Sequence, residues 1–221
     1  MLAQILEAPA DHGGLMVSLA AGEGSAAHPW LISAELNAGV SATRNVADLV
    51  HLFSLLHGRT PGLIDMAASQ SCWAGGDAFL REAAAAFVHE RAFLAALIAV
   101  AGPPPSTPGD SGTVCTIQSQ YYSMATLARS ERFGCAIGAV VTLLLDWQPL
   151  RAVMDGAAER LGLAVPESRL PDEEACRALL AAMPDRPRLD RTLAFGARQV
   201  LAHHTGLLDY CAVRAEAREA C

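Results

Sequence analysis

The sequence predicts an all-α protein: a single-domain bundle of four long helices with three or four short ones. Apolar residues make up 52% of the chain but aromatic residues only 5%, and alanine supplies much of the difference. Alanine favours helix because it loses no side-chain entropy there. No segment alternates apolar and polar residues between hairpin turns, so no strand is predicted. At 221 residues the chain fits one domain, 1–221.

The first half of the chain is expected to hold two long helices. Residues 1–30 contain several glycines and prolines and predict a short helix followed by an irregular N-terminal wrap. Residues 31–57 have helical apolar periodicity that ends at Gly58 and Pro61. A short helix is expected over 63–68. A long one follows over 78–101, with Asp77 as its N-cap.

The second half is expected to hold the other two long helices. Residues 102–113 are rich in proline and glycine and predict a loop. A long helix is expected over 117–148, kinked or ended by Pro149. Shorter helices are expected over 150–161 and 172–183, and the last long helix runs from an Asp190 N-cap to about residue 218.

Charge and composition exclude several functions. All 16 basic residues are arginines, so the chain has no lysine for a Schiff base, a pyridoxal phosphate or a P-loop. The net charge of −7 argues against nucleic acid and anionic membranes as partners. The longest apolar run, residues 133–145, is too short to cross a bilayer.

The cysteines and the N-terminus predict a cytoplasmic protein with reduced thiols. The six cysteines form no Cys-x-x-Cys pair and no zinc-binding spacing. Cys135 lies in an apolar helical run, where a buried free thiol is expected. The N-terminus has no positively charged region before its apolar stretch, so no secretory signal is predicted.

A ridge of small residues gives the first hypothesis on function. Ser130, Gly134, Gly138 and Thr142 recur at every fourth position, which places them on one side of a helix. The favoured interpretation is a close helix crossing, and the alternative is a slot for a small, largely apolar ligand or cofactor between the long helices. The candidate ligand-binding residues are Tyr122, Ser130, Glu131, Arg132, Gly134 and Gly138.

A second hypothesis is a di-iron or di-manganese oxidoreductase of ferritin-like or haem-oxygenase-like type. Such bundles need a Glu-x-x-His pair on two helices. Asp48 and His51 give one Asp-x-x-His, but apolar residues stand three positions before His203 and His204, so the second pair is missing. The candidate metal ligands are Glu35, Asp48, His51, Glu90, Glu131 and His203, with His204 as the substitute for His203.

The same polar residues also have a purely structural interpretation, which we favour. Arg44 and Asp48 have the spacing of a helical ion pair. His89, Glu90 and Arg91 are expected to form a charged surface belt, because three consecutive residues cover most of a helix circumference. A third hypothesis follows: a non-catalytic interaction or assembly module, such as a homodimer formed through an apolar helix face. The sequence identifies no catalytic residue.

Overall fold

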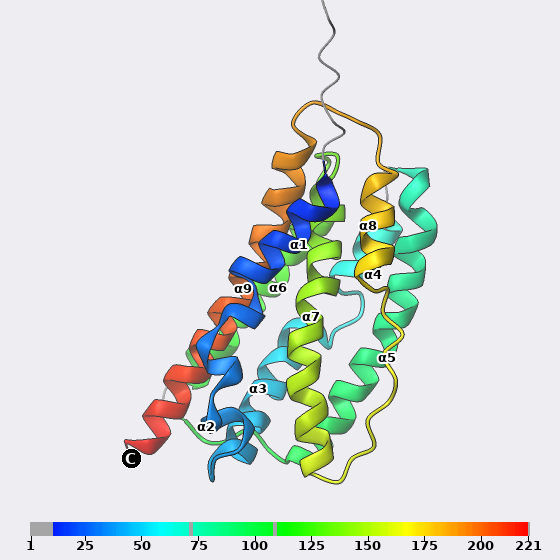
Figure 1. The fold of residues 1–221 in the computed structure, drawn as a ribbon. Helices are drawn as coiled ribbons and strands as arrows, with labels where there is room; N and C mark the ends of the chain where they lie inside the picture. The colour runs from blue at the N-terminus through cyan, green and yellow to red at the C-terminus, as the bar shows by residue number, and fades with distance from the viewer. Residues whose placement is uncertain (1–10, 71–72, 108–109, 221) are drawn as a thin grey trace, which may run out of the picture.

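The computed structural model describes residues 11–70, 73–107 and 110–220, and this part of the chain is all-helical, as predicted, with no strand (Figure 1). In chain order the elements are α1 (His12–Glu23), η1 (Ser25–Ala27), η2 (Pro29–Ile32), α2 (Ala34–Asn37), α3 (Ala42–His57), α4 (Leu63–Ser69), η3 (Ala74–Gly76), α5 (Asp77–Ala101), α6 (Asp110–Ala128), α7 (Cys135–Arg160), α8 (Glu173–Ala181) and α9 (Leu189–Glu219).

Helix α7 is the centre of the bundle, with α9 and α1 on one side and α5 on the other (Figure 1). Its buried side chains include Trp147, Leu143 and Met154, so apolar contacts surround it on several faces. Pro149 lies inside α7, and the helix continues to Arg160. The predicted end or separate helix at this point is therefore wrong. Burial on both sides of Pro149 outweighs the hydrogen bond that proline removes.

The predicted helix over 117–148 is two helices, α6 and α7, separated by a turn. Gly134 ends this turn with a φ of 89°, a left-handed conformation that glycine adopts most easily. Residues 31–57 are also divided, into η2, α2 and α3. For residues 1–30 a short helix followed by an irregular wrap is predicted; residues 12–23 form a regular helix, η1 and η2 follow it, and residues 1–10 lie outside the described part of the chain.

The predicted bounds of α4, α5, α8 and α9 are confirmed to within a few residues. The predicted N-caps Asp77 and Asp190 are wrong, because both residues lie in the first turn and Gly76 and Arg188 are the N-caps.

Helices α7 and α9 cross at very short range because glycines lie at the contact. A Cβ added to Gly138 would lie 2.3 Å from the Leu193 carbonyl oxygen. A Cβ added to Gly196 would lie 2.1 Å from the carbonyl oxygen of Cys135. The close crossing favoured for the small ridge is thus found at Gly138.

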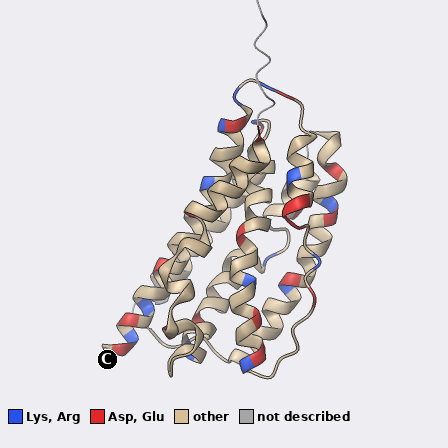
Figure 2. Ribbon diagram, viewed as in Figure 1, with Lys and Arg blue, Asp and Glu red and all other residues tan. Residues whose placement is uncertain are grey.

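Two helical segments are long and apolar enough to cross a membrane by length and composition alone. In the stretch 135–160, 72% of the most apolar window is buried inside the bundle, and in 74–101 the share is 39%. The first is a core helix. The second, α5 with η3, leaves an apolar face exposed. Charged residues are scattered over the helices and the connecting segments (Figure 2).

We predict that Gly196→Ala destabilises the protein by about 1–3 kcal/mol or more, because its methyl group would force α7 and α9 apart. Gly206→Ala in the same helix is the control. Its Cβ would meet only Gln120 Nε2 at 3.8 Å, so it should be neutral or stabilising. Urea unfolding of both variants measures the difference, and equal midpoints would contradict the close crossing.

Candidate functional site

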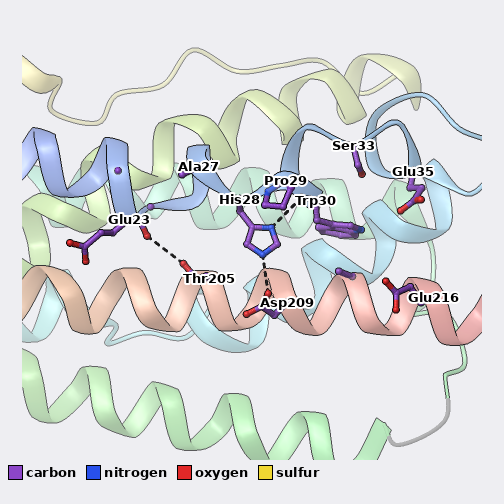
Figure 3. Close-up of a pocket in the computed structure, with 13 residues that line it drawn as sticks. Glu23, Ala27, His28, Pro29, Trp30, Ser33, Glu35, Thr205, Asp209 and Glu216 are labelled. Atoms are coloured by element: carbon purple, nitrogen blue, oxygen red, sulfur yellow. Dashed lines mark hydrogen bonds and ion pairs between the residues drawn. The ribbon is translucent and has the colours of Figure 1, made fainter.

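A groove of about 650 Å³ lies between α9 and the segment that joins α1 to α2. We call it the α9 groove. Figure 3 shows the side chains that line it, with α9 on one side and the η1–η2–α2 segment on the other. Its lining residues are Gly22, Glu23, Gly24, Ala27, His28, Pro29, Trp30, Ser33, Glu35, Thr205, Asp209, Ala212 and Glu216.

The turn at the edge of the groove is anchored in the core by Asp146. The Ser25 backbone N–H donates to Asp146 Oδ1 and the Ser25 hydroxyl donates to Oδ2, both at 2.6 Å. Gly24 fits here because any Cβ would lie 2.3 Å from Asp146 Oδ1. The chain between α1 and η2 is therefore fixed to α7 by a buried carboxylate.

His28 connects the two walls of the groove. Its Nδ1 accepts a hydrogen bond from the Trp30 backbone N–H at 3.3 Å, and its Nε2 lies 3.1 Å from Asp209 Oδ1 on α9 (Figure 3). A neutral imidazole with its proton on Nε2 satisfies both contacts, accepting at one nitrogen and donating at the other. The pair holds the η2 segment against α9.

Trp30 lies on the wall of the groove formed by η2 (Figure 3). The residue is only 5% exposed, and its indole Nε1 is enclosed by protein atoms with no hydrogen-bond partner among the described residues. Buried polar groups in folded proteins nearly always have a partner, so an unpaired indole N–H requires an explanation.

The groove carries a strong negative charge. Four of its lining residues are acidic: Glu23, Glu35, Asp209 and Glu216. Glu23 is paired with Arg198 at 3.1 Å, and both side chains are about half exposed. Glu35 and Glu216 form no ion pair among the described residues. A hollow lined by one sign of charge concentrates ions of the opposite sign.

Beneath the groove, Asp146 begins a buried chain of polar groups. His204 Nδ1 donates to Asp146 Oδ2 at 2.6 Å, and His204 Nε2 lies 2.8 Å from His57 Nε2. His204 is fully buried, whereas the adjacent His203 is partly exposed. Phe53, Phe87 and Trp147 surround the His57 ring. No groove residue reaches His57, so this chain is a structural connection rather than a reactive site.

Burial and neighbouring charges shift two pKa values in this chain. Burial, followed by the charges of His204, Arg91 and His203, lowers the pKa of His57 well below its ordinary value. Burial alone would raise the pKa of Asp146. The hydrogen bond and the charge of His204, together with the two hydrogen bonds from Ser25, outweigh this effect and lower the pKa. Only one proton fits between the two facing Nε2 atoms, so His57 and His204 cannot both be cations in this geometry.

The candidate metal ligands are not brought together. Among the described residues, no group of three or more histidines, cysteines and acids is placed to hold a metal ion. Asp48 instead pairs with Arg214 at 2.8 Å and Arg218 at 2.7 Å, not with Arg44 as predicted. Glu90 is buried and pairs with Arg151 at 2.7 Å, which corrects the predicted surface belt.

The remaining metal candidates are dispersed. His51 Nε2 contacts the Gly102 carbonyl oxygen, and His203 Nε2 contacts the Ser123 hydroxyl. Glu131 is exposed in the turn before α7, and Glu35 lies in the α9 groove. Each candidate therefore belongs to a different local environment.

The candidate ligand-binding residues are divided between the α6–α7 turn and its two flanking helices. Ser130, Arg132 and Gly134 line a cavity of about 20 Å³, the size of a single water. Ser130 and Arg132 also line an open surface hollow of about 510 Å³. Gly138 packs against Leu193, so the structure leaves no slot for a flat ligand at that point. Tyr122 is 61% exposed on α6.

The cysteines of the described segments are free thiols, and Cys135 is buried as expected. Burial, with the charges of Asp172 and Glu173, raises the pKa of Cys176 to about 12. Burial also raises the pKa of Cys211. A high pKa leaves little thiolate, so neither thiol is a nucleophile.

Comparison with known proteins places the chain in a family. The profile of a family described as a family of unknown function (DUF6975) matches residues 20–219. The chain belongs to this family. The matched region includes every lining residue of the α9 groove. No curated protein and no solved structure matches the chain.

Of the site residues that the sequence predicts, only Glu35 lies in the α9 groove, and it is predicted there as a metal ligand. His28 and Trp30 lie in the predicted irregular wrap, where no periodicity indicates which side chains point inward. Asp209 and Glu216 lie two turns apart on α9, which marks one helix face but not what covers it. The sequence pattern that could have indicated the groove is the spacing of Asp209 and Glu216 on one helix face, together with the single tryptophan, Trp30, of the N-terminal segment.

We predict that stability falls as the pH falls below about 6.5, because unfolded His57 takes up a proton there while the folded residue, with its lowered pKa, does not. His57→Phe should reduce the slope of unfolding free energy between pH 7 and 5 by up to about 1.4 kcal/mol per pH unit. The exposed His89→Gln variant is the control. Equal slopes in the wild type and His57→Phe would contradict the proposal that folded His57 stays neutral.

Proposed function

We propose that this protein is a small-molecule-binding bundle and that its ligand occupies the α9 groove. The observation that supports this most directly is a hollow of about 650 Å³ whose lining includes Glu35 and Glu216, two carboxylates without an ion-pair partner among the described residues. Ligand sites are concave and combine apolar surface with a few directed polar groups. Pro29, Ala27 and Ala212 supply the apolar part here.

The core contacts of the groove favour binding over catalysis. Its walls are held by Ser25–Asp146 and His28–Asp209, so the histidine of the lining and the acid beneath it serve to position the segment. The buried acid and histidines beneath it are fully engaged with one another. The hollow at Ser130 and Arg132 has no acidic residue in its lining, so it lacks the unpaired carboxylates of the α9 groove. The α9 groove is therefore the better-supported site.

A groove-filling variant tests this proposal. Ala212 lies in the groove, and its neighbour Val213 is 62% exposed outside it. In wild type and Val213→Trp, members of a panel of amines, acids, sugars and apolar fragments should shift the ¹⁵N indole signal of Trp30. Ala212→Trp should weaken that binding at least tenfold, because a new side chain occupies the hollow. A panel in which no compound moves the Trp30 signal would refute the site.

A second candidate is self-association through α5, suggested by its exposed apolar face. Exposed small apolar residues recur at spacings of three and four along this helix: Ala85, Val88, Ala92, Ala95 and Ala99. Such spacing places them on one face, where small side chains allow two helices to approach closely. In an antiparallel pair, the exposed Arg81 of one copy would lie beside the negative C-terminal end of the other α5.

This second candidate predicts that the protein elutes and scatters light as a dimer. Ala92→Glu, which places a charge in the centre of the face, should convert it to a monomer without changing its helicity. Ala202→Glu makes the same change at an exposed position of α9 and should leave the dimer intact. A monomeric wild type at high micromolar concentration would exclude the α5 interface.

A further inference from the structure

A cavity of about 340 Å³ lies between α3, α6 and the segment that follows α5. We infer that it is a second small-molecule site and that it takes an uncharged, largely apolar ring compound. Its volume is within the range of small-molecule sites, and its described lining residues do not overlap with those of the α9 groove. We call it the α3 cavity. Its described lining residues are Asp48, His51, Leu52, Ser54, Leu55, Pro104, Thr113, Val114 and Arg214.

The walls of the α3 cavity combine apolar side chains from three elements. One face of α3 contributes four lining residues, because they stand at helical spacings of three and four: Asp48, His51, Leu52 and Leu55. Pro104 of the segment after α5 and Val114 of α6 add apolar groups to those of Leu52 and Leu55. An apolar molecule that enters this space removes its own surface and that of the lining from water, which is favourable.

The segment over the cavity is held on both sides of Pro104. His51 Nε2 donates a hydrogen bond to the Gly102 carbonyl oxygen at 2.9 Å. Arg218 Nη1 donates to the Thr107 hydroxyl oxygen at 2.8 Å. Pro104 lies between these two contacts, and its ring fixes its own backbone φ. The cavity is therefore formed before a ligand arrives, so binding requires little further ordering of the chain.

The charges in the lining neutralise each other. Both carboxylate oxygens of Asp48 accept from Arg214 Nε, at 3.0 and 2.8 Å, and Oδ2 also accepts from Arg218 Nη1 at 2.7 Å. The side chains of Asp48 and Arg214 are 1% and 6% exposed. A charged ligand would lose its hydration here and find no unpaired carboxylate or guanidinium among the described lining residues. The cavity therefore favours a ligand without net charge.

The volume limits the size of the ligand. An apolar cavity of roughly 150 Å³ binds benzene, so the α3 cavity, at about 340 Å³, takes a molecule of two fused rings. One turn of an α-helix, about 10 Å wide and 5.4 Å high, fills roughly 400 Å³, which excludes a partner helix. The Ser54 hydroxyl can donate or accept one hydrogen bond, so one small polar group on the ligand is tolerated.

Four compounds test the ligand class by NMR: indanol, aminoindane, indanecarboxylate and glucose. The first three share one two-ring body and are uncharged, cationic and anionic at neutral pH, whereas glucose is uncharged but polar. Indanol should move the ¹³C methyl signals of Leu55, which are assigned by their loss in Leu55→Met. Its dissociation constant should be at least about tenfold below those of the other three compounds. The methyl signals of the fully exposed Val40 are the internal control.

A variant that fills the cavity tests the location. Val114 lines the cavity and is 41% exposed, so a larger side chain fits there without displacing the core. Val114→Trp should weaken indanol binding at least about tenfold, because the indole ring takes up the space of the ligand. Ser119→Trp makes the same change at an exposed position of α6 outside the lining and should leave binding unchanged.

A charge variant tests the selectivity. Val114→Glu adds an unpaired carboxylate to the lining, so it should weaken indanol binding and strengthen aminoindane binding by about fivefold or more. Ser119→Glu is the control and should change neither. A variant that merely disturbed the fold would weaken the binding of both compounds, so the reversed preference is specific to the proposed site.

Each other outcome overturns part or all of the inference. If aminoindane, indanecarboxylate or glucose binds the wild type as well as indanol does, and Val114→Trp abolishes that binding, the ligand class is wrong. If indanol at millimolar concentration leaves the Leu55 signals in place, the site is wrong. Indanol binding that is unchanged in both Val114→Trp and Val114→Glu also overturns the site. Binding that is lost in Ala212→Trp but kept in Val114→Trp assigns indanol to the α9 groove instead.

Discussion

The carboxylate of Asp146 is the contact on which the face of the bundle that carries the α9 groove depends. From the core helix α7 it accepts hydrogen bonds from Ser25 and from His204, and so joins the N-terminal segment, α7 and α9 at one buried point. His204 extends the connection to His57 of α3. Because an unpaired buried carboxylate is strongly destabilising, these four elements are held in one arrangement.

The α9 groove is a consequence of that arrangement. The turn at Gly24 and Ser25 fixes where the chain leaves α1, and His28 then holds η2 against Asp209. Both η1 and η2 contact α9, and acidic side chains of α1, α2 and α9 line the hollow beside them. A ligand bound as proposed above would be connected to the core through Ser25 and Asp146.

Elsewhere the buried charges have structural partners. Arg151 donates to Glu90 and also holds the segment after α7 through the Pro166 carbonyl oxygen. Asp48 is enclosed by Arg214 and Arg218. Ion pairs of this kind contribute little net stability but specify one packing, because either partner alone would be a buried unpaired charge. They engage Asp48 and Glu90, two of the four acids that the sequence offers as metal ligands.

The sequence by itself determined the helical class and the bounds of α4, α5, α8 and α9 to within a few residues, because alanine content, apolar periodicity and capping glycines act locally. It also indicated that the glycines after residue 133 permit a close helix crossing, which the contact of Gly138 with Leu193 confirms. Only the tertiary structure decided which acids are paired and which remain in the groove. Asp146 and Ser25 are 121 residues apart, and Glu90 and Arg151 are 61 apart. No local pattern specifies such partners, since they are chosen by how the helices pack.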